Sequence, residues 1–172
     1  MSARTWAFRA AAPAAFALAF GTPADAQEMG KPRLEPARAI GETVVGGYAG
    51  IGGFLLGKYV AERGAGIIGV ESDVTARRIG FAGGVVGGGL ATAGVVYGIG
   101  SMGNQTGDFN ATYLGTGVGF VAALGIARVV LGPAERPRPQ MSTARRWATV
   151  NALAMLPAIG ATIGFNSTRR YR

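Results

Sequence analysis

The segment that decides the fold is Gly80-Phe81-Ala82-Gly83-Gly84-Val85-Val86-Gly87-Gly88, which lies within a long apolar stretch. Gly80, Gly84 and Gly88 are four residues apart, and residues at this spacing share one face of a helix. A face made of glycines carries no side chains, so a second helix can approach it closely. In lipid, such contact is a main cause of helix association. The segment therefore predicts a membrane helix that packs through its backbone.

Glycine recurs at this spacing along the chain, which has 30 glycines in 172 residues. Besides the three glycines above, the members of such pairs are Gly46, Gly50, Gly53, Gly57, Gly94, Gly98, Gly115, Gly119, Gly160 and Gly164. We expect all of them to pack helix against helix, either within one subunit or between copies.

Four apolar stretches are long enough to span a membrane, since a transmembrane helix takes roughly 20 residues. They cover residues 40–60, 79–102, 111–132 and 147–165. The sequence therefore predicts an all-α membrane protein with about four glycine-rich transmembrane helices, in a membrane domain that covers residues 40–165.

The N-terminus has the pattern of a cleaved signal peptide over residues 1–26. Arg4 and Arg9 form a basic region, and a short apolar run follows at 10–20. Ala24-Asp25-Ala26 then matches the small-residue cleavage site of exported proteins. We expect the mature chain to begin outside the cytoplasm of a bacterium.

The basic residues between the apolar stretches predict the orientation of the chain. The connections at 61–78 and 133–146 carry several arginines, whereas the connection at 103–110 carries no Lys or Arg. By the positive-inside rule, the first two are cytoplasmic, and the polar lead at 27–39 is exported. The basic tail at 166–172 would then also be exported, against the rule. Either the tail contacts anionic headgroups, or the fourth stretch does not cross.

Three charges lie within the apolar stretches but close to their ends. They are Glu42, Lys58 and Arg128. Long side chains at such positions reach the membrane interface. We expect interfacial charges at all three positions.

The glycines also keep a second architecture open, because glycine is unfavourable in helices by roughly 1 kcal/mol relative to alanine in water. Residues 159–168 alternate between apolar and small or polar side chains, as a strand of a transmembrane barrel does. The alternative prediction is an eight-stranded transmembrane β-barrel, which would place the protein in the outer membrane rather than the favoured inner membrane.

The composition bears on the class of function. The chain has no cysteine and no histidine, so it lacks the commonest nucleophile, general base and metal ligand. We therefore expect no enzyme activity, no cofactor and no metal. The net charge is +8, but aromatic residues do not alternate with the basic ones as a nucleic-acid surface requires, so nucleic acid is not an expected partner.

The expected partners are the lipid bilayer and either further copies of the chain or a larger membrane complex. We expect a structural or assembly role through glycine-face packing. The alternative is a channel or small transporter, for which polar residues would have to line a pore. The candidates for this lining are Thr92, Thr112, Thr116, Asn151 and Thr162.

The glycine segment at 80–88, together with Thr112-Tyr113-Leu114-Gly115-Thr116-Gly117-Val118-Gly119, resembles small bacterial envelope proteins with glycine-zipper membrane segments. Four short helices of this kind are also similar to the channel family of mitochondrial inner-membrane translocases. The resemblance implies a fold of closely packed membrane helices and supplies no functional residue.

Overall fold

The structure is a computed structural model, and it describes residues 32, 33, 35–131 and 142–172. The helices of this part are α2 (Pro36–Ile67), α3 (Asp73–Gly100), α4 (Phe109–Leu131) and α5 (Thr143–Ser167). Each is long and apolar enough to cross a membrane. The prediction of an all-α membrane protein with four spans is confirmed. The predicted signal peptide at 1–26 lies outside the described residues.

The alternative prediction of a β-barrel is wrong. Strand structure in the described part is limited to β1 (Gln105–Thr106) and β2 (Arg170–Tyr171), which pair antiparallel. The alternating residues at 159–168 lie mostly in α5, where the glycines form a packing face for α4. The small or polar residues at every second position include Gly160 and Gly164, which are four residues apart and share one face of the helix.

Local sequence signals set the ends of the first two helices. α2 begins at Pro36, four residues before the predicted stretch, because proline is favoured in the first turn of a helix. It ends shortly before Gly69, whose φ of 81° lies in the left-handed region. Ser72 then caps α3 by accepting a hydrogen bond from the backbone N–H of Thr75 at 3.4 Å.

Helices α2 and α3 form an antiparallel hairpin with glycine on both sides of the interface. A Cβ added to Gly53 would lie 2.6 Å from the carbonyl oxygen of Gly87, and the same holds in reverse. A Cβ on Gly83 would lie 2.7 Å from the carbonyl oxygen of Gly57. Real Cβ atoms do not approach backbone this closely, so the hairpin depends on the absence of side chains here.

Helices α4 and α5 form a second hairpin with the same construction. A Cβ on Gly115 would collide with the carbonyl oxygen of Gly160, and a Cβ on Gly160 would collide with that of Gly115. Gly164 lies equally close to the backbone of Ala111. Pro157 lies inside a continuous α5 and packs against Gly119.

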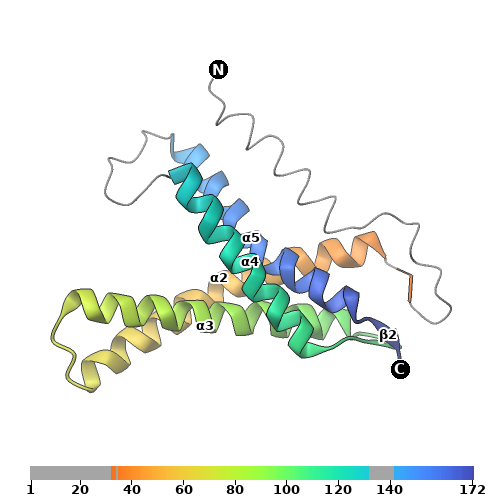
Figure 1. Cartoon of the computed structure of the whole chain (residues 1–172), viewed down its shortest axis with the longest axis horizontal. Helices are drawn as coiled ribbons and strands as arrows, with labels where there is room; N and C mark the ends of the chain where they lie inside the picture. Colours follow the sequence, from red (N-terminus) through yellow and green to blue (C-terminus); the bar gives the residue numbers. More distant parts are fainter. Residues whose placement is uncertain (1–31, 34, 132–141) are drawn as a thin grey trace.

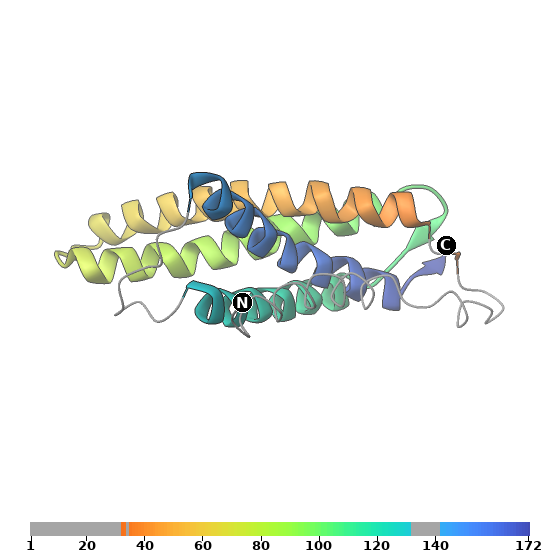
Figure 2. The same ribbon diagram turned by 90° about the horizontal axis from the view of Figure 1, so that it is seen from above.

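The two hairpins cross obliquely and meet at one end only. Figure 1 shows α4 and α5 running diagonally over the α2–α3 hairpin, and Figure 2 shows the same arrangement from above. The ends that meet are the start of α2, the end of α3, the start of α4 and the end of α5. The opposite ends of the hairpins diverge.

An aromatic cluster fills the space where the hairpins meet. The Phe165 ring is fully buried, and it occupies notches left by Gly100 and Gly107. Tyr97 packs edge-on against Phe165 at 6.0 Å and against Phe109 at 5.5 Å between ring centroids. The apolar core of the described chain is therefore small and lies at this end, next to several polar side chains.

We expect Gly115→Ala to destabilise the fold by about 1–3 kcal/mol, because the new methyl group would overlap the backbone of α5. Gly117→Ala is the matched control on the same helix, since an added Cβ there meets nothing within 4 Å. The control should leave stability unchanged or raise it slightly through helix propensity. Thermal unfolding of the purified protein in detergent, followed by circular dichroism, measures both. Equal stability of the two variants would contradict the glycine interface.

Candidate functional site

A group of buried and part-buried polar side chains lies at the end where the hairpins meet. We call it the end cluster, and its members are Arg38, Glu42, Gln105, Asn166 and Arg169. They come from the first turns of α2, from β1, and from the last turn of α5 with the second residue after it. Three segments distant in sequence therefore contribute to one site.

Glu42 is the acidic centre of the end cluster and is only 1% exposed. Its carboxylate lies 3.3 Å from Nε of Arg38, one turn earlier on α2. The Asn166 side chain donates a hydrogen bond to the other carboxylate oxygen at 3.3 Å. A buried carboxylate requires such partners, because an unpaired buried charge is costly.

Arg38 also closes the end of α3. Its Nη2 donates to the carbonyl oxygen of Ile99 at 2.9 Å and to that of Met102 at 2.8 Å, and it contacts the carbonyl oxygen of Gly100 as well. The last carbonyl groups of a helix have no partner within the helix, and a cation there is favoured by the helix dipole. One side chain of α2 therefore caps the helix that returns beside it.

Gln105 joins two arginines from opposite ends of the described chain. Its Oε1 accepts a hydrogen bond from Nη1 of Arg38 at 3.0 Å and from Nε of Arg169 at 2.6 Å. Nη1 of Arg169 also donates to Asn166 at 3.1 Å. The Arg169 side chain is therefore held inside the protein, and the residue is 5% exposed.

Burial lowers the pKa of the Arg169 guanidinium, and the nearby positive charge of Arg38 lowers it further. The carboxylates of Glu42 and Glu35 act in the opposite direction. Arg169 keeps its positive charge at neutral pH, since an arginine is protonated in proteins. The two carboxylates therefore compensate the two arginines electrostatically.

The backbone of the C-terminal tail, directly after Arg169, pairs with the connection between α3 and α4. Gln105 lies opposite Tyr171 in the β1–β2 ribbon, and the backbone N–H of Arg172 donates to the carbonyl oxygen of Asn104 at 3.0 Å. Contact with anionic headgroups, one of the two alternatives for the basic tail, does not apply to Arg169, which is buried. The side chains of Arg170 and Arg172 are exposed.

The three predicted interfacial charges differ in their surroundings. Glu42 does not face outward, because it is the centre of the end cluster. Lys58 is part-buried and forms an ion pair with Glu62 at 2.6 Å. Arg128 is exposed in the last turn of α4. Lys58 and Arg128 lie toward the ends of the hairpins that diverge.

Most of the predicted packing glycines lie in the contacts within this chain. Besides the glycines of the two hairpins described above, Gly46 faces Val96, and Gly84 faces the Phe54 ring. The others with a neighbour within 4 Å of an added Cβ are Gly50, Gly80 and Gly88. Gly94 and Gly98 are exceptions, because each is exposed and an added Cβ meets nothing within 4 Å. These two do not pack within the described chain.

Four of the five side chains considered as pore-lining residues have hydrogen-bond partners within the protein. Thr112 and Thr116 are buried, and their hydroxyl groups donate to the carbonyl oxygens of Asp108, just before α4, and of Thr112. The Thr162 hydroxyl lies 3.0 Å from that of Thr43 across the α2–α5 contact. Asn151 donates to the carbonyl oxygen of Trp147 on its own helix. These side chains are satisfied by the protein itself.

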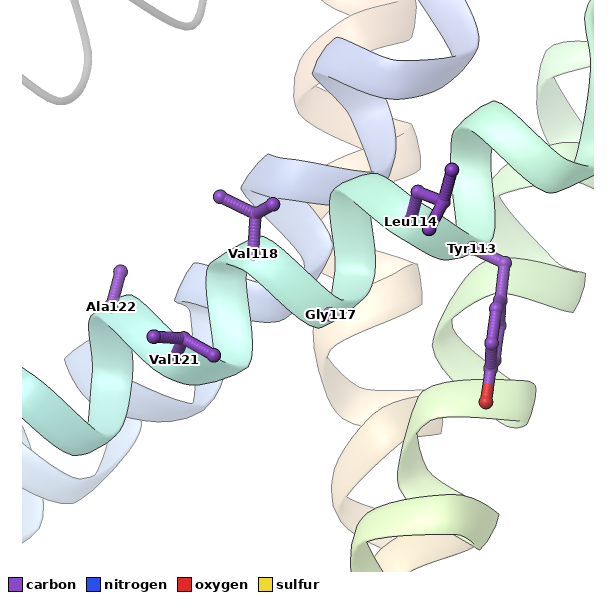
Figure 3. A pocket seen from close by; sticks show the side chains of 6 residues that line it. All are labelled: Tyr113, Leu114, Gly117, Val118, Val121 and Ala122. Carbon is purple, nitrogen blue, oxygen red and sulfur yellow. The ribbon is translucent and has the colours of Figure 1, made fainter.

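The surface hollow in Figure 3 lies along the outer face of α4. It exists because Gly117 leaves a gap between the side chains around it. The residues that line it are Tyr113, Leu114, Gly117, Val118, Val121 and Ala122. This lining is almost wholly apolar and suits contact with lipid chains.

The described residues also contain no group of three acidic, His or Cys side chains that could hold a metal ion.

Comparison of the chain with protein-family models, with curated proteins and with solved structures finds no match. Its own residues and their geometry therefore carry the inferences about function.

We expect Glu42→Ala to destabilise the protein by about 3 kcal/mol, because it leaves Arg38 and Arg169 without the buried carboxylate between them. Glu71→Ala, at an exposed position, is the control and should change stability by less than about 0.5 kcal/mol. Thermal unfolding in detergent measures both variants. A Glu42→Ala protein as stable as the control would contradict the role assigned to the end cluster.

Proposed function

We propose that this chain is a small, non-enzymatic integral membrane protein with a structural or assembly role. In this role it associates with copies of itself, or with a larger membrane complex, through a glycine face of α3. Four helices that can cross a membrane support the membrane setting. The absence of cysteine and histidine from the sequence supports a role without catalysis.

The observation that carries the proposal is the position of Gly94 and Gly98. They are four residues apart, exposed, and free of any neighbour within 4 Å of an added Cβ. The other glycine pairs of α3 are used by α2 within the same chain. Leu90 and Val86, one and two turns before Gly94, are exposed and continue the same face with apolar side chains. Such a face suits another membrane helix, because small residues allow close backbone contact in lipid.

The sequence favours the inner membrane of a bacterium as the location. The signal-peptide pattern and the arginines of the two predicted cytoplasmic connections agree on an exported start of the mature chain. The end cluster would then lie on the exported side, together with the C-terminal tail.

We expect Gly98→Leu to weaken association about tenfold or more without loss of the fold, because a leucine side chain separates the two backbones, whereas an added Cβ at Gly98 meets nothing within 4 Å in its own chain. Gly52→Leu is the matched control, since Gly52 is also exposed and without a close neighbour, but lies on α2. Native gels and light scattering in mild detergent measure the assembly state.

A complex that survives Gly98→Leu, or that is lost equally in Gly52→Leu, would contradict the assignment of this face. Gly84→Leu does not test association, because Gly84 packs against the Phe54 ring within the α2–α3 hairpin. That variant is expected to disturb the hairpin itself.

A further inference from the structure

The start of α3 carries a surface on which two arginines lie beside exposed apolar side chains. Arg77, Arg78, Val74 and Phe81 line one shallow hollow. Val74 is 61% exposed and Phe81 is 49% exposed. Basic and apolar groups are therefore presented together on one side of the helix, close to the turn that joins it to α2.

The two arginines are available for an external ligand. Nearby cations are occupied within the chain, since Lys58 pairs with Glu62 and the Arg63 guanidinium lies 5.4 Å above the Tyr59 ring. Among the residues that the structure describes, neither Arg77 nor Arg78 forms an ion pair or a side-chain hydrogen bond. Asp73 and Glu71 precede them at the turn but lie outside ion-pair distance.

The order of these residues along α3 matches the layers of a membrane. α3 begins at Asp73 and is one of the helices able to cross a bilayer, so its first turns lie at the bilayer edge. Phe81 follows Arg77 by one turn, about 6 Å farther along the helix axis toward the apolar part. A guanidinium at headgroup depth can form a two-pronged contact with a phosphate, and an aromatic ring one turn deeper can contact the first methylene groups of the acyl chains.

We propose that Arg77, Arg78, Val74 and Phe81 form a binding surface for an anionic phospholipid. The arginines contact the lipid phosphate, and Phe81 contacts the upper part of its acyl chains. Val74 precedes Arg77 by three residues and adds apolar surface on the headgroup side of the arginines. Charge complementarity selects an anionic headgroup over a zwitterionic one, because the latter brings its own cation to the phosphate. The surface requires only that α3 crosses the membrane, so it does not depend on the assembly role proposed above.

Native mass spectrometry of the full chain in neutral detergent tests this proposal, with phosphatidylglycerol or phosphatidylcholine added at equal concentration. The wild-type protein should retain more phosphatidylglycerol. The double variant Arg77→Gln/Arg78→Gln should lose about fivefold in affinity for each arginine removed. Arg170→Gln/Arg172→Gln is the matched control, because it removes the same charge from two exposed arginines of the C-terminal tail, which pairs with the connection that follows the opposite end of α3. Its affinity should stay within twofold of the wild type.

Three results would overturn the proposal. The first is equal retention of the two lipids by the wild-type protein, which needs no variant and holds even if a variant misfolds. The second is an equal loss in the two double variants, which would indicate a general effect of net charge. The third is displacement of the lipid by inorganic phosphate at the same concentration, which would indicate a free-anion site.

Phe81→Ser should shorten lipid retention while the helical circular dichroism spectrum stays unchanged.

Discussion

Close contact between glycine backbones is the interaction on which the rest of this structure depends. Between lipid-embedded helices there is little hydrophobic gain from association, so dispersion contact must hold them together. At Gly53 and Gly87, and again at Gly115 and Gly160, each backbone fills the space that a side chain of its partner would need. The contact is therefore reciprocal, and even a single methyl group on either side would separate the helices.

Glycine contacts hold the two helices of each hairpin together. The two hairpins are joined to each other by different interactions. The aromatic cluster around Phe165 supplies apolar contact, and the end cluster supplies directed hydrogen bonds. Buried charges rarely add much net stability, because their desolvation offsets their attraction. Arg38 and Arg169 instead fix which segments meet, since both must reach the one oxygen of Gln105. We infer that the end cluster contributes mainly specificity to the fold.

The sequence predicted the features that depend on local pattern and missed those that depend on distant partners. Four spans followed from apolar length. Spacing of four identified packing glycines, but it could not distinguish Gly94, which faces outward, from Gly84, which faces Phe54. The burial of Arg169 was not predictable, because its partner Gln105 lies 64 residues away and the charge rule treats every arginine as exposed.

The pairing of the tail also constrains how the chain crosses the membrane. β1 lies before α4 and β2 lies after α5, and the two strands pair directly. The start of α4 and the end of α5, which lie next to these strands, are therefore on the same side of any membrane. Either both helices cross or neither does, so a structure in which only the fourth stretch fails to cross is incompatible with the pairing. Burial of Arg169 beside Glu42 explains how a basic tail can lie on that side, because its first arginine is compensated within the protein rather than left exposed.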